Sequence, residues 1–238
     1  MSTSKKPAPP RPFIFVLAGV NGAGKSSVGG AMLLEHGLTW YNPDSFAREL
    51  AQSGVPLEEA NAQAWQHGKE LLQKAIAEGA NHALETTLGA NTMPALLEQA
   101  AASHAVVMLF CGLESAEMHI ERVRLRVTQG GHDIPDNKIR ERWTASRLHL
   151  IKLMPHLARL QVFDNSAQAK TGQKIPNPIL VLEMLDGVIV LPDLENKRAL
   201  ESIPAWARPI VQAAVELQIS SGQSAPPRPR TRRAQKNQ

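Results

Sequence analysis

Residues 19–26 read GVNGAGKS and follow directly on the apolar run 13-FIFVLA-18. The octapeptide fits the pattern G-x-x-x-x-G-K-[ST], with both glycines, the lysine and the serine in register. Glycines let successive backbone N–H groups converge on one anion, and a helix that begins there adds its unpaired N–H groups and positive dipole end. A plain glycine-rich turn is the alternative. The position of the motif between a predicted strand and a predicted helix favours a loop that binds a nucleoside triphosphate.

The loop predicts the cofactors ATP and Mg²⁺. We expect Lys25 to reach the β- and γ-phosphates and Ser26 to offer its hydroxyl to the metal ion. The residues predicted to bind the nucleotide are Gly19, Asn21, Gly22, Ala23, Gly24, Lys25, Ser26 and Ser27.

The overall composition bounds the class of protein. The chain has 238 residues, enough for one large domain or two small ones. Its net charge of +4 comes from the ends, because residues 1–12 and 222–238 hold eight lysines and arginines and no acid. No apolar run reaches the roughly 18 residues that span a bilayer, and no secretory signal is visible. The single Cys111 cannot form an intrachain disulfide, so we expect a cytoplasmic protein without a membrane partner.

Apolar runs alternate with helical patterns along the chain, which predicts an α/β fold. Strands are expected at 13–18, 38–42, 81–87, 104–112 and 160–166, the last of them completing the main sheet. Helices are expected at about 25–36, 44–52, 57–78, 92–103, 115–129, 137–150 and 204–217. Asp186-Gly187 between two apolar runs predicts a hairpin within 178–192. Together these elements predict the three-layer sandwich of P-loop NTPases, a mostly parallel sheet flanked by helices, with a C-terminal hairpin and helix.

The chain divides into three expected segments. Residues 1–12 are predicted to be a disordered basic arm, and residues 220–238 a disordered arginine-rich tail. Residues 13–219 are expected to form one kinase domain with a lid at about 115–150. Other P-loop classes fit poorly, because the body lacks an LSGGQ-like signature, an N-K-x-D motif after a strand, and the paired acids of motor ATPases. The layout that remains is that of a small-molecule kinase.

Two acids follow predicted strands. Asp44 comes after the strand at 38–42, at the carboxyl edge where open α/β sheets bind ligands, and its carboxylate can accept the proton of an attacking hydroxyl. The alternative is that Asp44 only caps the helix after Pro43. Glu85 and Thr86 end another predicted strand, where an acid is costly unless it faces a ligand or metal; an exposed strand end is the alternative. We assign all three side chains to the substrate site.

Arginines gather on the two helices of the predicted lid. Arg122 and Arg126 share one helix face, and Arg140 lies on the next helix, after the turn 130-GGHDIPD-136. Two helices that bracket a Gly-Gly turn form a hinged flap, whose arginines could neutralise charge on the transferred phosphoryl group. The alternative for each arginine is a solvated helix face with glutamate partners. His132 in the turn fits an exposed loop as well as a lid contact.

These pieces together resemble the shorter, stand-alone branch of the zeta-toxin family of P-loop kinases. The matching stretches are AGVNGAGKSS (18–27), YNPDSFAREL (41–50), ALETTLG (83–89), IERVRLRVTQGGHDIPDNKIRERW (120–143) and VFDNS (162–166). The P-loop alone is unspecific, whereas its combination with N-P-D, E-T-T and the arginine-rich lid motif is specific.

The resemblance implies an ATP-dependent kinase that phosphorylates a sugar hydroxyl of UDP-N-acetylglucosamine or a related nucleotide sugar. A small antitoxin that blocks the nucleotide site is an implied possible partner. By position, Lys25 would bind the phosphates, Asp44 would be the general base and Glu85 would hold the substrate.

The resemblance also implies roles for the lid. Arg122 and Arg126 would stabilise the charge of the transition state and are assigned to catalysis with Asp44 and Lys25. His132 and Arg140 would contact the substrate, and Arg140 is the candidate for a second phosphate-binding arginine.

Two other functions stay open. The chain could be a kinase of another small metabolite, or an ATP-gated binding protein whose tail 226-PPRPRTRR-233 docks on nucleic acid or an acidic partner. The tail favours only weak, salt-sensitive binding and has no aromatic side chains for base stacking. Specific recognition of nucleic acid is therefore not expected.

Overall fold

The structure is a computed structural model, and it describes residues 11–35, 39–129, 131, 133–168 and 176–222. The predicted arm and tail lie almost wholly outside these residues, as does His132. In the part of the chain that is described, no helix combines the length and apolar character needed to span a membrane.

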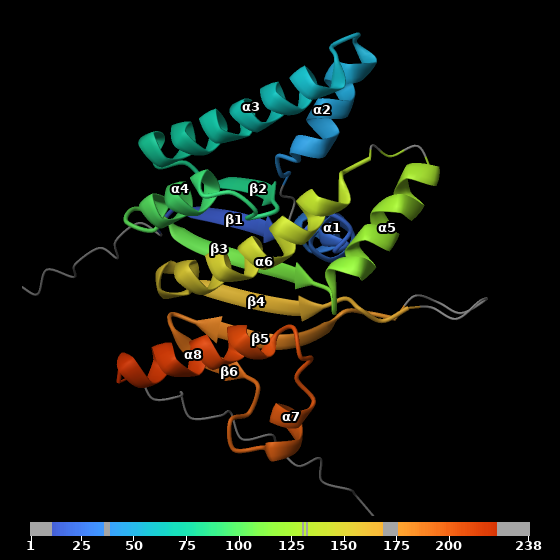
Figure 1. The fold of residues 1–238 in the computed structure, drawn as a ribbon. Helices are drawn as coiled ribbons and strands as arrows, with labels where there is room; N and C mark the ends of the chain where they lie inside the picture. The colour runs from blue at the N-terminus through green and yellow to red at the C-terminus, as the bar shows by residue number, and fades with distance from the viewer. Residues whose placement is uncertain (1–10, 36–38, 130, 132, 169–175, 223–238) are drawn as a thin grey trace, which may run out of the picture.

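A mixed sheet of six strands forms the centre of the molecule (Figure 1). The strands are β1 Phe13–Ala18, β2 His82–Thr86, β3 Ala105–Gly112, β4 Arg159–Asp164, β5 Ile179–Leu185 and β6 Val188–Leu191. Their order in space is β2-β1-β3-β4-β5-β6. The first four of these run parallel to one another, and β5 and β6 are antiparallel to their neighbours. The predicted α/β fold is confirmed.

Helices cover both faces of the sheet and complete three layers (Figure 1). Helix α1 (Lys25–Glu35) covers one face, and α4 (Thr92–Ala100), α6 (Asp136–Leu153) and α8 (Arg208–Ser220) cover the other. The remaining helices are α2 Pro43–Gln52, α3 Leu57–Glu78, α5 Ala116–Thr128 and α7 Lys197–Glu201, with a 3₁₀ turn at Met154–His156. Helix α3 ends where predicted, because Gly79 adopts the left-handed conformation that closes a helix. Helix α4 ends at Ala100, three residues before its predicted end. Helix α8 begins at Arg208, four residues after its predicted start, with a proline in its first turn.

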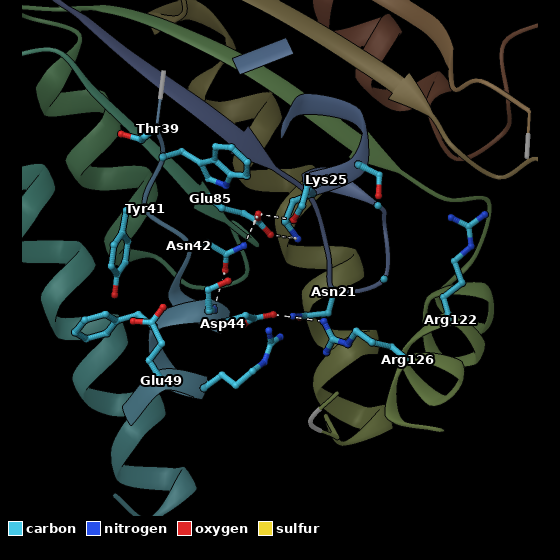
Figure 2. A pocket seen from close by; sticks show the side chains of 18 residues that line it. Asn21, Lys25, Thr39, Tyr41, Asn42, Asp44, Glu49, Glu85, Arg122 and Arg126 are labelled. Atoms are coloured by element: carbon cyan, nitrogen blue, oxygen red, sulfur yellow. Dashed lines mark hydrogen bonds and ion pairs between the residues drawn. The ribbon is translucent and has the colours of Figure 1, made fainter. Parts of the chain in front are cut away.

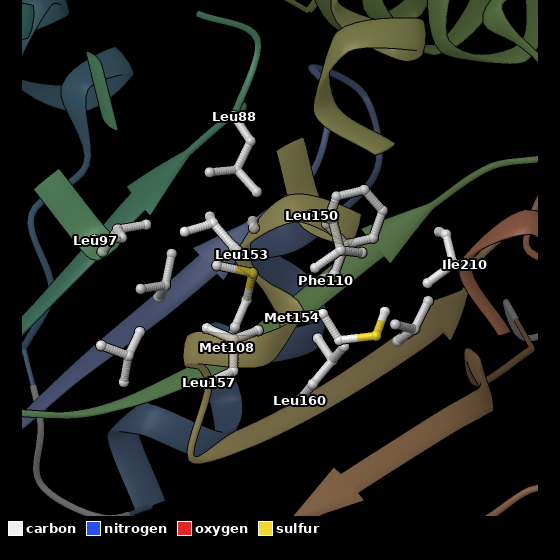
Figure 3. Close-up of a cluster of buried hydrophobic side chains, with 14 of the residues drawn as sticks. Leu88, Leu97, Met108, Phe110, Leu150, Leu153, Met154, Leu157, Leu160 and Ile210 are labelled. Atoms are coloured by element: carbon white, nitrogen blue, oxygen red, sulfur yellow. The ribbon is translucent and has the colours of Figure 1, made fainter. Parts of the chain in front are cut away.

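Alternate residues of β1 face the two sides of the sheet, as the period of a strand requires. Ile14 and Val16 belong to the large core under α4, α6 and α8. Leu17 packs on the opposite face with Cys111 in a smaller cluster. Figure 3 shows the large core, where side chains of β3 and β4 meet those of α6 and α8. Each fully buried leucine there stabilises the fold by about 2 kcal/mol relative to an exposed one.

Two strand predictions were wrong. Of the predicted strand 38–42, the described residues 39–42 form no strand, because only Tyr41 bridges to β2, through Tyr41 N–H to Ala83 O at 2.9 Å and Glu85 N–H to Tyr41 O at 2.9 Å. Proline at 43 has no N–H to extend the ladder and begins α2 instead. The strand β4 is not the last of the main sheet, since β5 and β6 continue the same sheet.

The hairpin itself was predicted correctly. Asp186 and Gly187 both have positive φ, 46° and 81°, which is the conformation of a two-residue type I′ turn. Its strands β5 and β6 extend the sheet because β5 pairs antiparallel with β4 from Arg159↔Leu185 onward.

Replacing Gly19 with alanine should strongly destabilise the fold. Gly19 follows β1 with φ +137°, and an added Cβ would lie 2.2 Å from the carbonyl oxygen of Cys111 in β3. We expect Gly19→Ala to lower the free energy of unfolding by about 3 kcal/mol, combining backbone strain with overpacking against main chain. Urea denaturation measures the loss. Gly54→Ala is the control, because Gly54 has φ +97° and open space around it. Equal losses at both sites would show that the close approach to β3 does not matter.

Candidate functional site

The carboxyl ends of β1 and β2 bring the glycine loop, residues 19–26, beside Glu85. Leu17 pairs with Glu85 and Ala18 with Thr86 in the parallel ladder. The ladder continues for one more bond, from the N–H of Gly19 to the carbonyl oxygen of Thr86 at 3.2 Å. Parallel strands end at one edge, so the sequence-distant motifs share the ligand-binding edge of the sheet.

The glycine loop adopts a conformation that favours glycine. Gly22 and Gly24 both have φ +82°, and an added Cβ at Gly24 would lie 2.5 Å from Nδ2 of Asn165. That amide donates to the carbonyl oxygen of Ala23 at 2.9 Å, so the residue after β4 holds the loop from outside. Helix α1 begins at Lys25. The loop therefore lies between a strand and a helix, as its motif requires.

Glu85 is the centre of a buried polar cluster (Figure 2). Its Oε1 lies 3.3 Å from the Lys25 ammonium. Its Oε2 accepts hydrogen bonds from the Ser26 hydroxyl at 2.9 Å and from the Asn42 amide at 3.0 Å. Lys25 is 6% exposed and Glu85 8%. An exposed strand end is thereby excluded, and the two buried charges compensate each other.

Asp44 lies in the first turn of α2, across from the cluster (Figure 2). The structure gives the capping role to Asn42, whose Oδ1 accepts from the Ser45 N–H at 3.2 Å. The Asp44 carboxylate instead lies 3.5 Å from Nη1 of Arg126, which reaches it from α5. Both side chains are about one-third exposed. Asp44 is therefore a partly exposed carboxylate paired with a cation.

The lid arginines occupy different places. Arg122 donates to the carbonyl oxygen of Asn165 at 2.7 Å, above the glycine loop. Arg124 forms an exposed ion pair with Asp136, as the surface alternative expects. Arg140 contacts Glu117 on α5, with both side chains more than half exposed.

Arg142, which the sequence analysis did not select, reaches the site. Its Nη1 donates to Oδ1 of Asn21 in the glycine loop at 2.7 Å. Burial lowers the pKa of its guanidinium, and the charge of Asp44 opposes that shift. Arg140 and Arg142 are two positions apart, about 200° around a helix, so only one of them can face inward. The spacing of Arg140 and Arg142 is visible in the sequence, but the sequence does not show which face of α6 is turned to the loop.

Two cavities meet at this cluster. The first, of about 750 Å³, is lined by the glycine loop, the segment from Thr39 to Glu49, Arg122 and Arg126. The second, of about 540 Å³, lies between α3, the end of β2 and the start of α6. Their shared wall consists of Asn21, Lys25, Asn42, Asp44 and Glu85. A group transferred from a ligand in one cavity to a ligand in the other would pass this wall.

The second cavity has its own set of polar and aromatic side chains. Thr86, which the sequence predicts to bind substrate, lines it, and its hydroxyl accepts from the Leu88 N–H at 3.1 Å. Lys138 and Arg142 supply positive charge and Asp133 and Glu141 negative charge, and Lys138 pairs with Glu141 at 2.9 Å. Trp65 on α3 lines the cavity and stays 41% exposed. Sequence reasoning missed Trp65, because a lone tryptophan in a helical pattern indicates a core position more often than a ligand contact.

The oxygen atoms at the glycine loop suit a magnesium ion. Mg²⁺ prefers hard oxygen ligands and is usually held by one or two protein groups together with phosphates and water. The Ser26 hydroxyl and the Glu85 carboxylate are such groups, 2.9 Å apart. Among the described residues, no group of three or more His, Cys, Asp or Glu side chains could hold a metal by itself. The donors present therefore fit an ion that arrives with a nucleotide.

His119 supports the glycine loop from α5. It is 1% exposed, and its Nδ1 pairs with the carbonyl oxygen of Asn21 at 2.9 Å, so Nδ1 carries the hydrogen. Burial lowers the pKa of His119 to about 4, and the charge of Lys25 adds to the effect. The neutral imidazole is the form that fits the folded state.

The shifted histidine predicts that stability falls in mild acid. The folded pKa of about 4 lies below the ordinary value of 6.5, so between these values the unfolded chain binds more protons. The free energy of unfolding is therefore unaffected by titration of this histidine above about pH 6.5. It falls as the pH drops toward 4, by on the order of 3 kcal/mol. We expect His119→Asn, which keeps a donor for Asn21, to reduce the dependence of the free energy of unfolding on pH between these values. Urea denaturation at several pH values measures it. The partly exposed His156→Asn serves as control; an equal change there would contradict the assignment.

Comparisons with known proteins agree with this geometry. The sequence model of the zeta toxin family matches residues 1–171. A chain of the AvrRxo1-ORF1:AvrRxo1-ORF2 complex with ATP aligns with a TM-score of 0.59 at 17% identity, over 82% of this chain and 64% of that one. The native complex gives 0.57 at 17% identity, over 87% and 71%. At such identities the likeness shows the fold alone.

Other comparisons add less. The PezAT toxin-antitoxin system of Streptococcus pneumoniae aligns at a TM-score of 0.49 and 15% identity, over 93% of this chain and 92% of that one, too low to carry an argument. No curated protein matches the chain. This chain spans less than two thirds of the length of the first AvrRxo1 chain, so that protein's partners and ligand do not transfer to it directly.

Proposed function

Because this chain belongs to the zeta toxin family, we propose that it is an ATP-dependent kinase whose acceptor is a hydroxyl group of a small molecule. The observation that carries the proposal is the wall shared by the two cavities, which contains both Lys25 and Asp44. A phosphate-binding lysine and an accessible carboxylate at one boundary are the two groups that in-line transfer to a hydroxyl needs.

The first cavity is the proposed site of ATP. The N–H groups of the glycine loop and the start of α1 would bind the phosphates, together with Lys25. Ser26 and Glu85 would hold Mg²⁺, which when bound neutralises charge on the β- and γ-phosphates. Lys25 now lies 3.3 Å from Glu85, so binding of phosphates would exchange one anionic partner for another. Arg122 and Arg126 line the same cavity and would stabilise the charge of the transferred group.

The second cavity is the proposed site of the acceptor. Asp44 would accept the proton of the attacking hydroxyl, while Arg126 keeps its carboxylate oriented. We propose a nucleotide sugar of the UDP-N-acetylglucosamine type as acceptor. The guanidinium of Arg142 suits a phosphate, and the exposed ring of Trp65 suits a flat or sugar ring. The volume of about 540 Å³ lies within the ordinary range for small-molecule sites.

The lid and the partner are proposals as well. We propose residues 13–219 as the kinase domain, with α5 and the first turns of α6 as a lid, since the later part of α6 packs into the large core through Leu150 and Leu153. A small antitoxin covering the first cavity is the proposed protein partner, on the strength of the family.

Phosphorus NMR tests the proposed function. ATP and Mg²⁺ are incubated with the protein and, in turn, UDP-N-acetylglucosamine, other UDP-sugars and simple sugars. The expected result is a new phosphomonoester on a nucleotide sugar. A phosphomonoester on another metabolite only would keep the kinase and overturn the substrate. Slow release of inorganic phosphate with every acceptor would overturn both the kinase and its substrate, and would favour an ATP-gated binding protein. Such a protein should lose its partner when residues 222–238 are deleted.

Replacing Trp65 with alanine should weaken binding of the acceptor more than binding of ATP. Ring stacking on an aromatic side chain contributes about 1–3 kcal/mol, so we expect the KM of the acceptor to rise about tenfold or more. The KM of ATP should stay within about twofold, and Trp65→Phe should restore most of the effect. Leu57→Ala is the control, since Leu57 is exposed on the same helix outside both cavities. Equal changes in both KM values would contradict the acceptor assignment.

A further inference from the structure

We infer that Asn42 is a positioning residue that fixes the distance between the base Asp44 and the acidic centre at Glu85; this inference rests on the proposed kinase function. Both ends of the Asn42 amide are used (Figure 2). Oδ1 accepts from the Ser45 N–H at 3.2 Å, and Nδ2 donates to Glu85 Oε2 at 3.0 Å. One side chain thus joins the first turn of α2, which carries Asp44, to the end of β2.

The backbone explains why this link is needed. At Tyr41 the chain is held to β2 by two main-chain bonds, from the Tyr41 N–H to Ala83 O and from the Glu85 N–H to Tyr41 O. After Tyr41 the direction changes, and Pro43 has no N–H with which to extend the ladder. Asn42 lies at this corner, and its side chain carries the connection onward from the sheet. Asp44 is two residues further on, so its place relative to Glu85 depends on the corner.

The link also reaches the glycine loop. Glu85 Oε2 accepts from Ser26 as well as from Asn42, at 2.9 and 3.0 Å. A continuous path therefore runs from Ser26 through Glu85 and Asn42 to the Ser45 amide. When phosphates enter the first cavity, Ser26 and Lys25 would exchange Glu85 for the phosphates as their partner. The Glu85 carboxylate, which also binds Asn42, would then lose these contacts.

Capping alone does not require asparagine here. Serine, threonine and aspartate cap helices about as well as asparagine. Asn196 caps α7 in the same way, with its Oδ1 accepting from the Ala199 N–H at 3.2 Å, but it lines neither cavity. At position 42, aspartate would set a second negative charge against Glu85, and serine is too short to span both partners. The donor that faces Glu85 is the feature that asparagine adds.

Matched substitutions separate the two roles. Asn42→Asp and Asn42→Ser keep a capping oxygen but lose the donor to Glu85, and Asn196→Asp and Asn196→Ser make the same changes at a remote cap. We expect the Asn42 variants to lower kcat about 10- to 100-fold, as loss of an orienting hydrogen bond does, with the KM of ATP within about threefold. The Asn196 variants should leave kcat unchanged, and urea denaturation should give similar stabilities for Asn42→Ser and Asn196→Ser, whereas Asn42→Asp should be less stable because its carboxylate faces Glu85. Asn42 variants that keep kcat would overturn the inference.

A spectroscopic readout does not depend on turnover. The side-chain amide signal of Asn42 is identified by its absence in Asn42→Ser. We expect it to shift in Glu85→Gln and on addition of ATP with Mg²⁺, whereas the Asn196 signal should not move. An Asn42 signal whose position is unchanged in Glu85→Gln would overturn the inference. Failure of the proposed function would appear differently, as a wild-type chain that transfers phosphate to no acceptor.

Discussion

Replacing Asp44 with asparagine should lower kcat for phosphoryl transfer by about 10³-fold, within the range that loss of a general base produces. Asparagine has nearly the same shape and can still accept from Arg126, which lies 3.5 Å from the carboxylate. It cannot take the proton of the acceptor hydroxyl. ATP should bind with unchanged affinity, because the phosphates are held by the glycine loop and Lys25. Rates are measured by phosphorus NMR, and ATP binding by calorimetry.

Asp136 provides a matched control. It too is an aspartate in the first turn of a helix and pairs with an arginine of α5, Arg124, at 2.7 Å. It lies outside both cavities. We expect Asp136→Asn to change kcat by less than about twofold. An Asp44→Asn protein that kept a tenth or more of the wild-type kcat would mean that Asp44 is not the base.

Replacing Lys25 with methionine should abolish ATP binding and also destabilise the protein without ligand. Lys25 and Glu85 are both buried, and removal of one partner leaves the other charge uncompensated. Glu85 keeps its bonds from Ser26 and Asn42, so we expect a loss of about 3 kcal/mol, at the low end for broken buried pairs. Urea denaturation of the protein without nucleotide gives the stability, and calorimetry gives ATP binding.

The double variant Lys25→Met/Glu85→Gln separates the two effects. Neutralising Glu85 removes the buried charge, so the double variant should be more stable than Lys25→Met while still failing to bind ATP. Lys74→Met is the control, because Lys74 is 68% exposed, its ammonium lies 4.0 Å from Glu78, and loss of such a pair costs less than about 1 kcal/mol. A double variant no more stable than Lys25→Met would mean that an uncompensated Glu85 charge is not the cause of the lost stability.

Most elements of the fold could be predicted because their signals are local. The turn at Asp186-Gly187 has positive φ at both residues, which those residue types favour in any context. The stretch 38–42 has the apolar and aromatic composition of a strand, but a strand needs a partner along its whole length. The chain turns into α2 at Pro43 after one bridge. Whether the hairpin joins the main sheet also depends on a neighbour, β4, whose edge the sequence does not mark.

For the candidate site, the sequence by itself determined the glycine loop and the presence of acids at strand ends. The loop's residues are contiguous, and backbone freedom, helix start and charge all lie within 19–26. Only the tertiary structure decided that Ser26 and Asn42 share the carboxylate of Glu85, and that Arg142 rather than Arg140 reaches the loop. These contacts join residues 43 to 121 positions apart. Local patterns carry backbone preference and burial, whereas contacts at such separations follow from strand order and from the face each helix turns to the sheet.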